Sequence, residues 1–218
     1  MTTVADKIDA KLVKDLREKS GAPMGDCLKA LQHTKGDIEE AFVELRKRGM
    51  ASAQKKAARS TNEGAVGTYI HAGGKIGVLL EVNCESDFVA RTEDFQELLR
   101  DIAMHIAASD PRYVKPEDVT IEDLEREKEI YRAQAAATGK PAPVIEKIVD
   151  GKMAKFYEEV CLLEQPFIKE QTISIKELIA QKVGKLGENI TVRRFARFKV
   201  GAPDWTVSQT TAAEAASE

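Results

Sequence analysis

The sequence has few of the residues that usually build a disulfide framework or a metal centre. Its 218 residues include three cysteines, three histidines and one tryptophan. Cys27, Cys84 and Cys161 are odd in number, lie far apart and form no CxxC pair. We therefore expect reduced, mostly buried thiols rather than disulfide bonds or a zinc site.

The recognised catalytic motifs are missing as well. His33, His71 and His105 have no HExxH spacing, and the sequence contains no GxSxG, GxxxxGK[ST] or GxGxxG. No cofactor and no metal site is predicted, and the chain is expected to work by binding rather than as an enzyme. A thiol enzyme built on Cys84 stays open as a minor hypothesis, because a triad can be assembled from residues far apart in sequence.

Long apolar runs and an excess of positive charge are also missing. No run approaches the roughly 20 residues that span a bilayer, and the N-terminus is charged where a signal peptide needs an apolar centre. The net charge is −3 and the pI is near 5.8, which does not favour direct nucleic-acid binding. We expect a cytoplasmic protein without a membrane partner.

Residues 6–49 are expected to form three short helices. Ile8, Leu12 and Leu16 recur four positions apart, which places an apolar stripe along the first helix. SGAPMG, residues 20–25, predicts the end of that helix and a tight loop, because glycine adopts backbone angles that other residues resist.

The second and third helices follow from the same periodicity. The second is expected to direct Cys27, Leu28 and Leu31 inward. Asp37 is the predicted N-cap of the third, with a glutamate three positions later, and Gly49 is expected to stop it.

Residues 50–63 are polar and basic, and they predict a linker that can be partly helical. Its cluster of Lys55, Lys56 and Arg59 could contact phosphate, but a solvated connector is the favoured interpretation for so short a run.

Two strands, at 65–72 and 75–84, are expected to form a hairpin around Gly73 and Gly74. A third β-rich run at 189–200 should join them, giving one antiparallel three-stranded sheet packed by helices on one face.

Further helices are expected between the sheet segments. An apolar face runs over 93–108, and a last helix is predicted near 174–186. Heptad-like spacing on both sides of the turn at 138–143 predicts an antiparallel helical hairpin over about 120–164. The fold class is thus α+β.

The segment EVNCESDFVAR, residues 81–91, is unusual. It begins as a buried strand, then places Glu85, Ser86 and Asp87 directly before the bulky Phe88. An aromatic ring behind an acidic turn either covers the core or contacts a partner. Without further information, burial is the favoured reading.

Five ordered blocks give the chain a strong resemblance to the bacterial elongation factor Ts family, in its short form. They are KLVKDLREKSGAPMGDCLKAL with GDIEEAFVELRKRG (11–49), EVNCESDFVAR (81–91), DIAMHIAASDPRYV (101–114), EKIVDGKMAKFYEEVCLLEQPFIK (146–169) and GENITVRRFARFKVG (187–201).

The resemblance implies a domain organisation. It consists of a ubiquitin-associated-like three-helix module at 1–49 and an α+β core and dimerisation domain at 64–201 that carries the helical hairpin. Composition predicts the basic linker at 50–63 between them and, from its Ala, Thr, Ser and Glu content, a disordered tail at 202–218.

The resemblance also implies a function, guanine-nucleotide exchange on the GTPase elongation factor Tu during translation elongation. The ring of Phe88, with Asp87, would enter the partner beside its magnesium and phosphate site and promote GDP release. The implied partner-binding residues are Asp87, Phe88, Ser86, Val89, Met24 and His105.

Two departures from the family pattern concern this surface. Ser86 stands where the family usually has threonine, which keeps the hydroxyl and loses a methyl group. Met24 is followed by Gly25 where the family often has a second methionine, so one apolar contact is missing. A homodimer is the family-based expectation, and a multivalent helical adaptor without exchange activity is the alternative function.

Overall fold

The structure is a computed structural model that describes residues 8–137, 139, 141–202 and 206–208. The chain divides into two compact units, and each is described by itself. Of the described residues, the first unit holds 8–64, Asn83–Leu98 and Glu177–Thr191, and the second holds Ala65–Val82, Leu99–Lys176 and the residues from Val192 onward.

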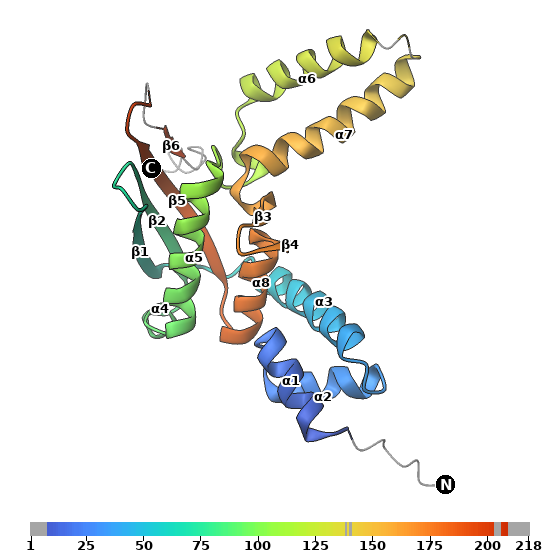
Figure 1. Cartoon of the computed structure of the whole chain (residues 1–218), viewed down its shortest axis with the longest axis vertical. Helices are drawn as coiled ribbons and strands as arrows, with labels where there is room; N and C mark the ends of the chain where they lie inside the picture. Colours follow the sequence, from blue (N-terminus) through green and yellow to red (C-terminus); the bar gives the residue numbers. More distant parts are fainter. Residues whose placement is uncertain (1–7, 138, 140, 203–205, 209–218) are drawn as a thin grey trace. The chain divides into compact units, whose positions relative to one another are not determined.

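Three helices of the first unit pack around a common core, as Figure 1 shows. They are α1 (Ala10–Ser20), α2 (Met24–His33) and α3 (Ile38–Lys56). The buried residues that they share are Val13, Leu16, Cys27, Ala30, Leu31, Ala41 and Leu45. Most of helix α8 (Ile175–Leu186) also belongs to this unit.

The ends of these helices follow from their capping residues. Gly21 ends α1 with φ +65°, a left-handed conformation that glycine adopts without steric cost. Asp37 is the N-cap of α3, as predicted, and its side chain accepts a hydrogen bond from the Glu40 N–H at 2.9 Å. The prediction for Leu28 is wrong, because it is exposed and Ala30 takes the inward position.

The prediction that Gly49 stops the third helix is also wrong, since α3 continues to Lys56. A Cβ atom built on Gly49 would lie 3.6 Å from the Ala180 carbonyl oxygen, and one built on Gly184 would lie 3.8 Å from the Gly49 Cα. Gly49 therefore lies where α3 and α8 approach each other closely, at distances that still leave room for a methyl group. The Lys56 ammonium donates to the Val183 carbonyl at 3.4 Å, so the first half of the expected linker packs as helix.

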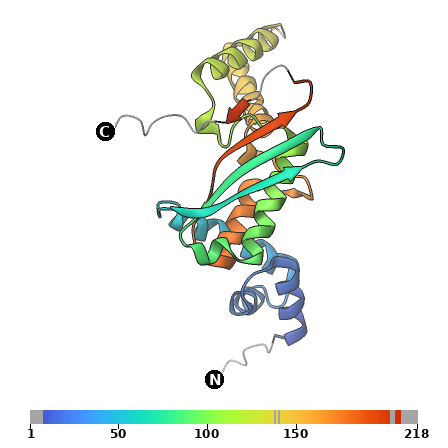
Figure 2. The same ribbon diagram turned by 90° about the vertical axis from the view of Figure 1, so that its left-hand side faces the viewer.

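The main sheet has four strands in the order β1-β2-β5-β6 (Figure 2). Its strands are β1 (Glu63–Ile70), β2 (Ile76–Cys84), β5 (Ile190–Lys199) and β6 (Thr206–Ser208). Gly73 and Gly74 both have positive φ and form the predicted hairpin turn. The Val200 N–H donates to the Lys75 carbonyl at 2.9 Å, which places the end of β5 beside the start of β2 and makes the two antiparallel.

The three expected strands are therefore present, and the fourth is a correction. β6 pairs antiparallel with β5 and lies within the stretch expected to be a disordered tail. The rest of that stretch, at 203–205 and 209–218, lies outside the described residues.

Helix α5 (Glu93–Ser109) covers one face of the sheet in the second unit. A Cβ atom on Gly67 of β1 would lie 2.5 Å from the Leu99 Cγ, so only glycine allows this approach. The Arg197 guanidinium of β5 donates to the Ala107 carbonyl at 3.0 Å. These contacts identify the helix-covered side of the sheet.

Helices α6 (Ile121–Ala136) and α7 (Ala142–Val160) of the second unit lie side by side (Figure 1). The Arg132 guanidinium pairs with Glu146 across them at 3.2 Å. The buried residues of this part are Val119, Val149, Met153, Phe156, Val160 and Cys161. Positions 138 and 140, in the predicted turn, lie outside the described residues.

A small second sheet was not predicted. It pairs β3 (Pro166–Phe167) antiparallel with β4 (Glu170–Ser174). The 3₁₀ turns η1 (Pro116–Asp118) and η2 (Leu162–Glu164) flank the helical pair.

The two glycines at helix contacts should respond oppositely to alanine. Gly49→Ala should raise the free energy of unfolding by about 0.5–1 kcal/mol, because it lies inside a helix with room for a methyl group. Gly67→Ala should lower it, because the methyl group would overlap Leu99. Chemical denaturation measures both, and loss of stability in Gly49→Ala would contradict the helix-interior placement.

Candidate functional site

The acidic turn after β2 begins a four-residue helix, α4 (Asp87–Ala90). Ser86 is its N-cap, and the Ser86 Oγ accepts a hydrogen bond from the Val89 N–H at 3.4 Å. The Ser86 carbonyl accepts from the Ala90 N–H at 3.3 Å. Four residues are too few for a helix to be stable by itself, so α4 depends on its neighbours for its conformation.

The side chains of α4 separate into a buried and an exposed side. Val89 and Ala90 are buried beneath the turn, whereas the Phe88 ring is 80% exposed. Asp87 forms an ion pair with Arg91 at 2.7 Å on the outer side. Phe88 is the most exposed of the large apolar side chains among the described residues, and burial in the core is not its role here.

The C-terminal end of α4 is held by two side chains. The Thr92 hydroxyl donates to the Val89 carbonyl at 2.7 Å, and the Gln96 amide donates to the Ala90 carbonyl at 2.8 Å. The Val89 carbonyl also accepts from the Thr92 N–H at 3.0 Å, so the two side-chain bonds reinforce the end of this short helix.

The N-terminal end of α4 is held by a residue that the sequence analysis missed. The Ser86 hydroxyl donates to the Glu188 Oε1 at 2.6 Å, and the Ser86 N–H donates to the Glu188 Oε2 at 3.0 Å. Glu188 follows Gly187, which ends α8 with φ +81°. No local pattern in the sequence marks Glu188 as the acceptor for Ser86.

In a second contact between the same two segments, the donor is on the segment of Glu188 and the acceptor is on the segment of Ser86. The Glu85 carboxylate accepts from the Asn189 N–H at 2.6 Å and from Arg59 at 3.4 Å. The Asn189 hydrogen bond, followed by the contact with Arg59, lowers the pKa of Glu85 below its ordinary value. The Asn189 amide donates in turn to the Arg59 carbonyl at 2.9 Å. We call the four residues Glu85, Ser86, Glu188 and Asn189 the turn clamp.

Met24 lies apart from this turn in sequence and begins α2. It was expected in a tight loop over 20–25, but the loop is confined to 21–23 and Met24 is helical and 53% exposed. Leu28, one turn later, is exposed on the same helix. The two side chains offer an apolar contact surface, of which the sequence analysis identified only Met24.

His105 is fully buried on α5 and hydrogen-bonded at both ring nitrogens. The Gln165 amide group donates to the Glu159 carbonyl at 2.8 Å, so its oxygen accepts from the His105 Nε2–H at 3.0 Å. The His105 Nδ1 accepts from the Ile168 N–H at 3.3 Å. This geometry requires the neutral Nε2–H tautomer, and burial lowers the pKa of His105.

The cysteines have the environment of structural thiols. All three are buried and free. Burial, assisted by the nearby Glu188 carboxylate, raises the pKa of the Cys84 thiol, whose Sγ donates to the Ser86 carbonyl at 3.1 Å. Burial raises the pKa of Cys161 to about 12. Protonated thiols are poor nucleophiles, which argues against the thiol-enzyme hypothesis.

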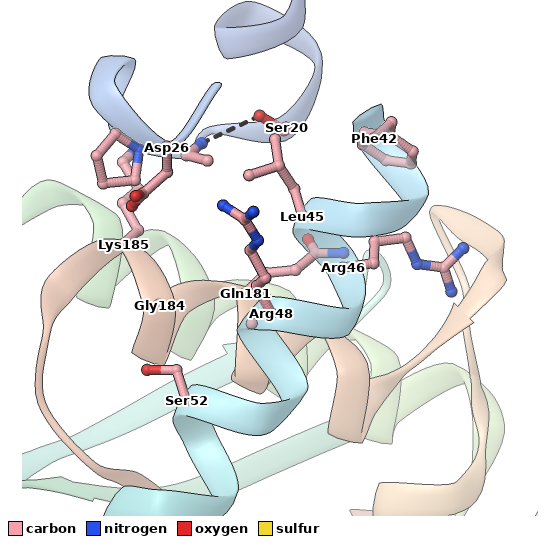
Figure 3. Close-up of a pocket in the computed structure, with 13 residues that line it drawn as sticks. Ser20, Asp26, Phe42, Leu45, Arg46, Arg48, Ser52, Gln181, Gly184 and Lys185 are labelled. Atoms are coloured by element: carbon pink, nitrogen blue, oxygen red, sulfur yellow. Dashed lines mark hydrogen bonds between the residues drawn. The ribbon is translucent and has the colours of Figure 1, made fainter. Parts of the chain in front are cut away.

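A pocket of about 210 Å³ in the first unit is lined by α2, α3 and α8 (Figure 3). It is smaller than the roughly 300–1,000 Å³ of typical ligand sites. Its lining cations are already paired, Arg48 with Glu44 and Lys185 with Asp94. The pocket is best explained as a packing seam between helices.

The described residues offer neither a candidate metal centre nor a membrane-spanning helix. Within residues 8–137, 139, 141–202 and 206–208, no group of three or more His, Cys, Asp or Glu side chains could hold a metal ion. Among the helices of the described part of the chain, none is both long and apolar enough to cross a bilayer.

An exposed aromatic ring on a turn held at both ends is typical of proteins that act by docking onto another protein. The elongation factor Ts family model matches residues 4–202. Elongation factor Ts of Koribacter versatilis is 75% identical over 201 residues, covering 92% of each chain. That of Solibacter usitatus is 60% identical over 195 residues, covering 89% of this chain and 92% of the relative.

The chain therefore belongs to the elongation factor Ts family. It acts as a guanine-nucleotide exchange factor in translation elongation, and the adaptor alternative is not favoured.

The hydrogen bonds of His105 can be tested one at a time. His105→Asn keeps an oxygen where Nδ1 accepts from Ile168, whereas His105→Gln keeps a donor toward Gln165. Protection of the Ile168 amide from hydrogen exchange should persist in the asparagine variant and fall by about tenfold or more in the glutamine variant. The reverse order would contradict the tautomer.

The pH dependence provides a second readout of His105. Its pKa is lowered in the folded state, so the unfolded chain binds more protons once the pH falls below the ordinary value of 6.5. Acidification below this pH should therefore reduce the free energy of unfolding more steeply in the wild type than in His105→Gln, which has no group that titrates there.

Proposed function

We propose that the chain binds elongation factor Tu carrying GDP, and that the Phe88 turn disturbs the partner's magnesium and phosphate site. The observation that carries this proposal is the exposure of Phe88 on a turn fixed at both ends. A G protein holds GDP through loop amides and Mg²⁺. An apolar ring that displaces an element of that site weakens its hold on the phosphates.

The energetics require a broad interface around the ring. Burying one Phe side chain contributes about 1.5–3 kcal/mol, which is only one to two decades of affinity. Binding that loosens GDP is reciprocal, so nucleotide must in turn loosen the factor. The further binding energy is assigned to additional surfaces, among them the exposed Met24 and Leu28 of α2.

The predicted partner residues then divide by position. Phe88 and Asp87 face outward and are proposed to contact the GTPase directly. Ser86 and Val89 shape the turn from beneath, as cap and as buried anchor. His105 is proposed to act indirectly, by holding the partly exposed Ile168 between β3 and β4.

The domain organisation is proposed in the same terms. We assign α1, α2 and the first part of α3 to a ubiquitin-associated-like module at 1–49, and 64–201 to the core domain with the α6–α7 pair as its antiparallel hairpin. The factor is proposed to act in the cytoplasm by binding alone, without an enzymatic step or a cofactor of its own.

The face of the sheet opposite α5 in the second unit, exposed among the described residues, supports the proposed homodimer. The Cδ1 of Ile70 lies 3.1 Å from the Cβ position of Gly77, on the side opposite Gly67 and Arg197. Strand alternation puts more exposed apolar residues there, and together the group is Val66, Ile70, Leu79 and Phe198. A face of this kind fits a second copy of itself about a two-fold axis.

Phe88→Ala should reduce stimulated GDP release by about tenfold or more at limiting factor concentration, since the wedge ring is removed. Release of a fluorescent GDP from elongation factor Tu measures this, and Phe88→Leu should retain part of the activity because it keeps apolar bulk. The free energy of unfolding should change by less than about 0.5 kcal/mol because the ring is exposed. Full activity of Phe88→Ala would contradict the proposal.

Leu79→Glu should convert the wild-type dimer to a monomer, because a charge would be buried in an apolar interface. Sedimentation velocity distinguishes the two masses. Val43→Glu, which places the same charge at an exposed apolar position of α3, is the matched control and should remain dimeric. A monomeric wild type would overturn this part of the proposal.

A further inference from the structure

Ser86, the N-cap of α4, forms hydrogen bonds through all of its polar atoms. Its N–H and its hydroxyl both donate to the one carboxylate of Glu188, at 3.0 and 2.6 Å. Its hydroxyl oxygen accepts from Val89, and its carbonyl oxygen accepts from Cys84 and Ala90. Every polar atom of the residue that begins α4 is therefore occupied.

We propose that Glu188 is the positioning residue of the exchange surface, because its carboxylate fixes Ser86 and thereby the direction in which Phe88 projects. This inference rests on the proposed function and goes one step further into it. Glu188 bonds to Ser86 and not to Phe88, so its role is to set the conformation of the turn in the unbound protein.

The need for such a residue follows from the length of α4. A four-residue helix forms too few backbone hydrogen bonds to offset the entropy of ordering it. An exposed aromatic ring on an unfixed turn would have to be ordered during binding, which lowers affinity. Two charge-assisted hydrogen bonds, which Ser86 donates to the single carboxylate of Glu188, order the turn in the free protein.

The Ser86 hydroxyl links the carboxylate to the helix. It has one proton, which it gives to Glu188, and it therefore offers lone pairs to the Val89 N–H. Donation to a charged acceptor also makes the hydroxyl oxygen a better acceptor. This explains why a hydroxyl side chain is needed at position 86, and why Ser86→Thr should be tolerated where Ser86→Ala is not.

Glu85 and Asn189 add a second contact between the two segments that Ser86 and Glu188 join. The Glu85 carboxylate accepts from the Asn189 N–H at 2.6 Å, while Glu188 accepts from Ser86. Glu85 thus bonds to Asn189, and the next residue, Ser86, bonds to Glu188. Two neighbouring contacts in opposite donor directions resist sliding of one segment along the other better than a single contact does, so they fix the register of the turn.

The central experiment measures exchange with Glu188 variants in two backgrounds. In the wild-type background, Glu188→Ala should lower stimulated GDP release at limiting factor by about tenfold, as expected for the loss of two hydrogen bonds. Glu188→Gln can still accept from the Ser86 N–H and donate to its hydroxyl, so it should stay within about threefold of wild type.

The second background separates positioning from general damage. In a Phe88→Ala chain the ring is gone, so Glu188→Ala should lower GDP release much less than tenfold, through Asp87 of the same turn alone. An equal tenfold loss in both backgrounds would overturn the proposal, because Glu188 would then act through something other than Phe88. Glu93→Gln, an exposed carboxylate change in the first turn of α5, is the matched control and should leave release unchanged.

A measurement on the free protein makes the test independent of the partner. The Ser86 and Val89 amides should lose protection from hydrogen exchange by about tenfold in Glu188→Ala and keep it in Glu188→Gln. Unchanged protection in the alanine variant would overturn the positioning role.

The outcomes also distinguish failure of the proposed exchange function from failure of the positioning role of Glu188. If wild-type factor fails to stimulate GDP release, the proposed function fails, whatever the amides show. If the wild type is active and Phe88→Ala is impaired while Glu188→Ala is fully active, the exchange function stands and the positioning role of Glu188 fails.

Discussion

The proposed exchange surface depends on the turn clamp, in which Glu85 bonds to Asn189 and Ser86 bonds to Glu188. Phe88 projects from a helix too short to hold its own shape, and its exposed ring receives no support from a surrounding core. One acidic residue before the ring, Glu85, therefore has a structural purpose, because its carboxylate accepts from the Asn189 N–H. Glu188 on the other segment accepts from the Ser86 N–H and hydroxyl, and together these bonds hold the turn from which the aromatic ring projects.

The fold was largely predictable, because local signals agree with the tertiary structure. The Gly-Gly hairpin and the β-rich runs predicted the three long strands within about two residues of their observed ends, and the Asp37 cap predicted the start of α3. The errors arose where a tertiary contact decides. Gly49 resembles a helix stop, but it lies inside α3 because α8 approaches it closely, and no local pattern contains that information.

The site was predictable only in part. Ser86, Asp87 and Phe88 are contiguous, so their unusual order attracts notice. Glu188 is a glutamate among many in a chain that is 32% charged, and nothing local marks it as the acceptor for Ser86. The family resemblance implied a partner contact for His105, whereas the structure buries this residue and bonds its Nδ1 to the Ile168 N–H. Pairings between distant residues cannot be read from one sequence.

The separation of the clamp residues has a consequence for biosynthesis. Ser86 and Glu188 are 102 positions apart, so a ribosome that has made the first must add almost half the protein before the second emerges. Until then the aromatic turn lacks its acceptor and cannot hold its working shape. A chain that ends before Glu188 would therefore lack the carboxylate that is proposed to position Phe88.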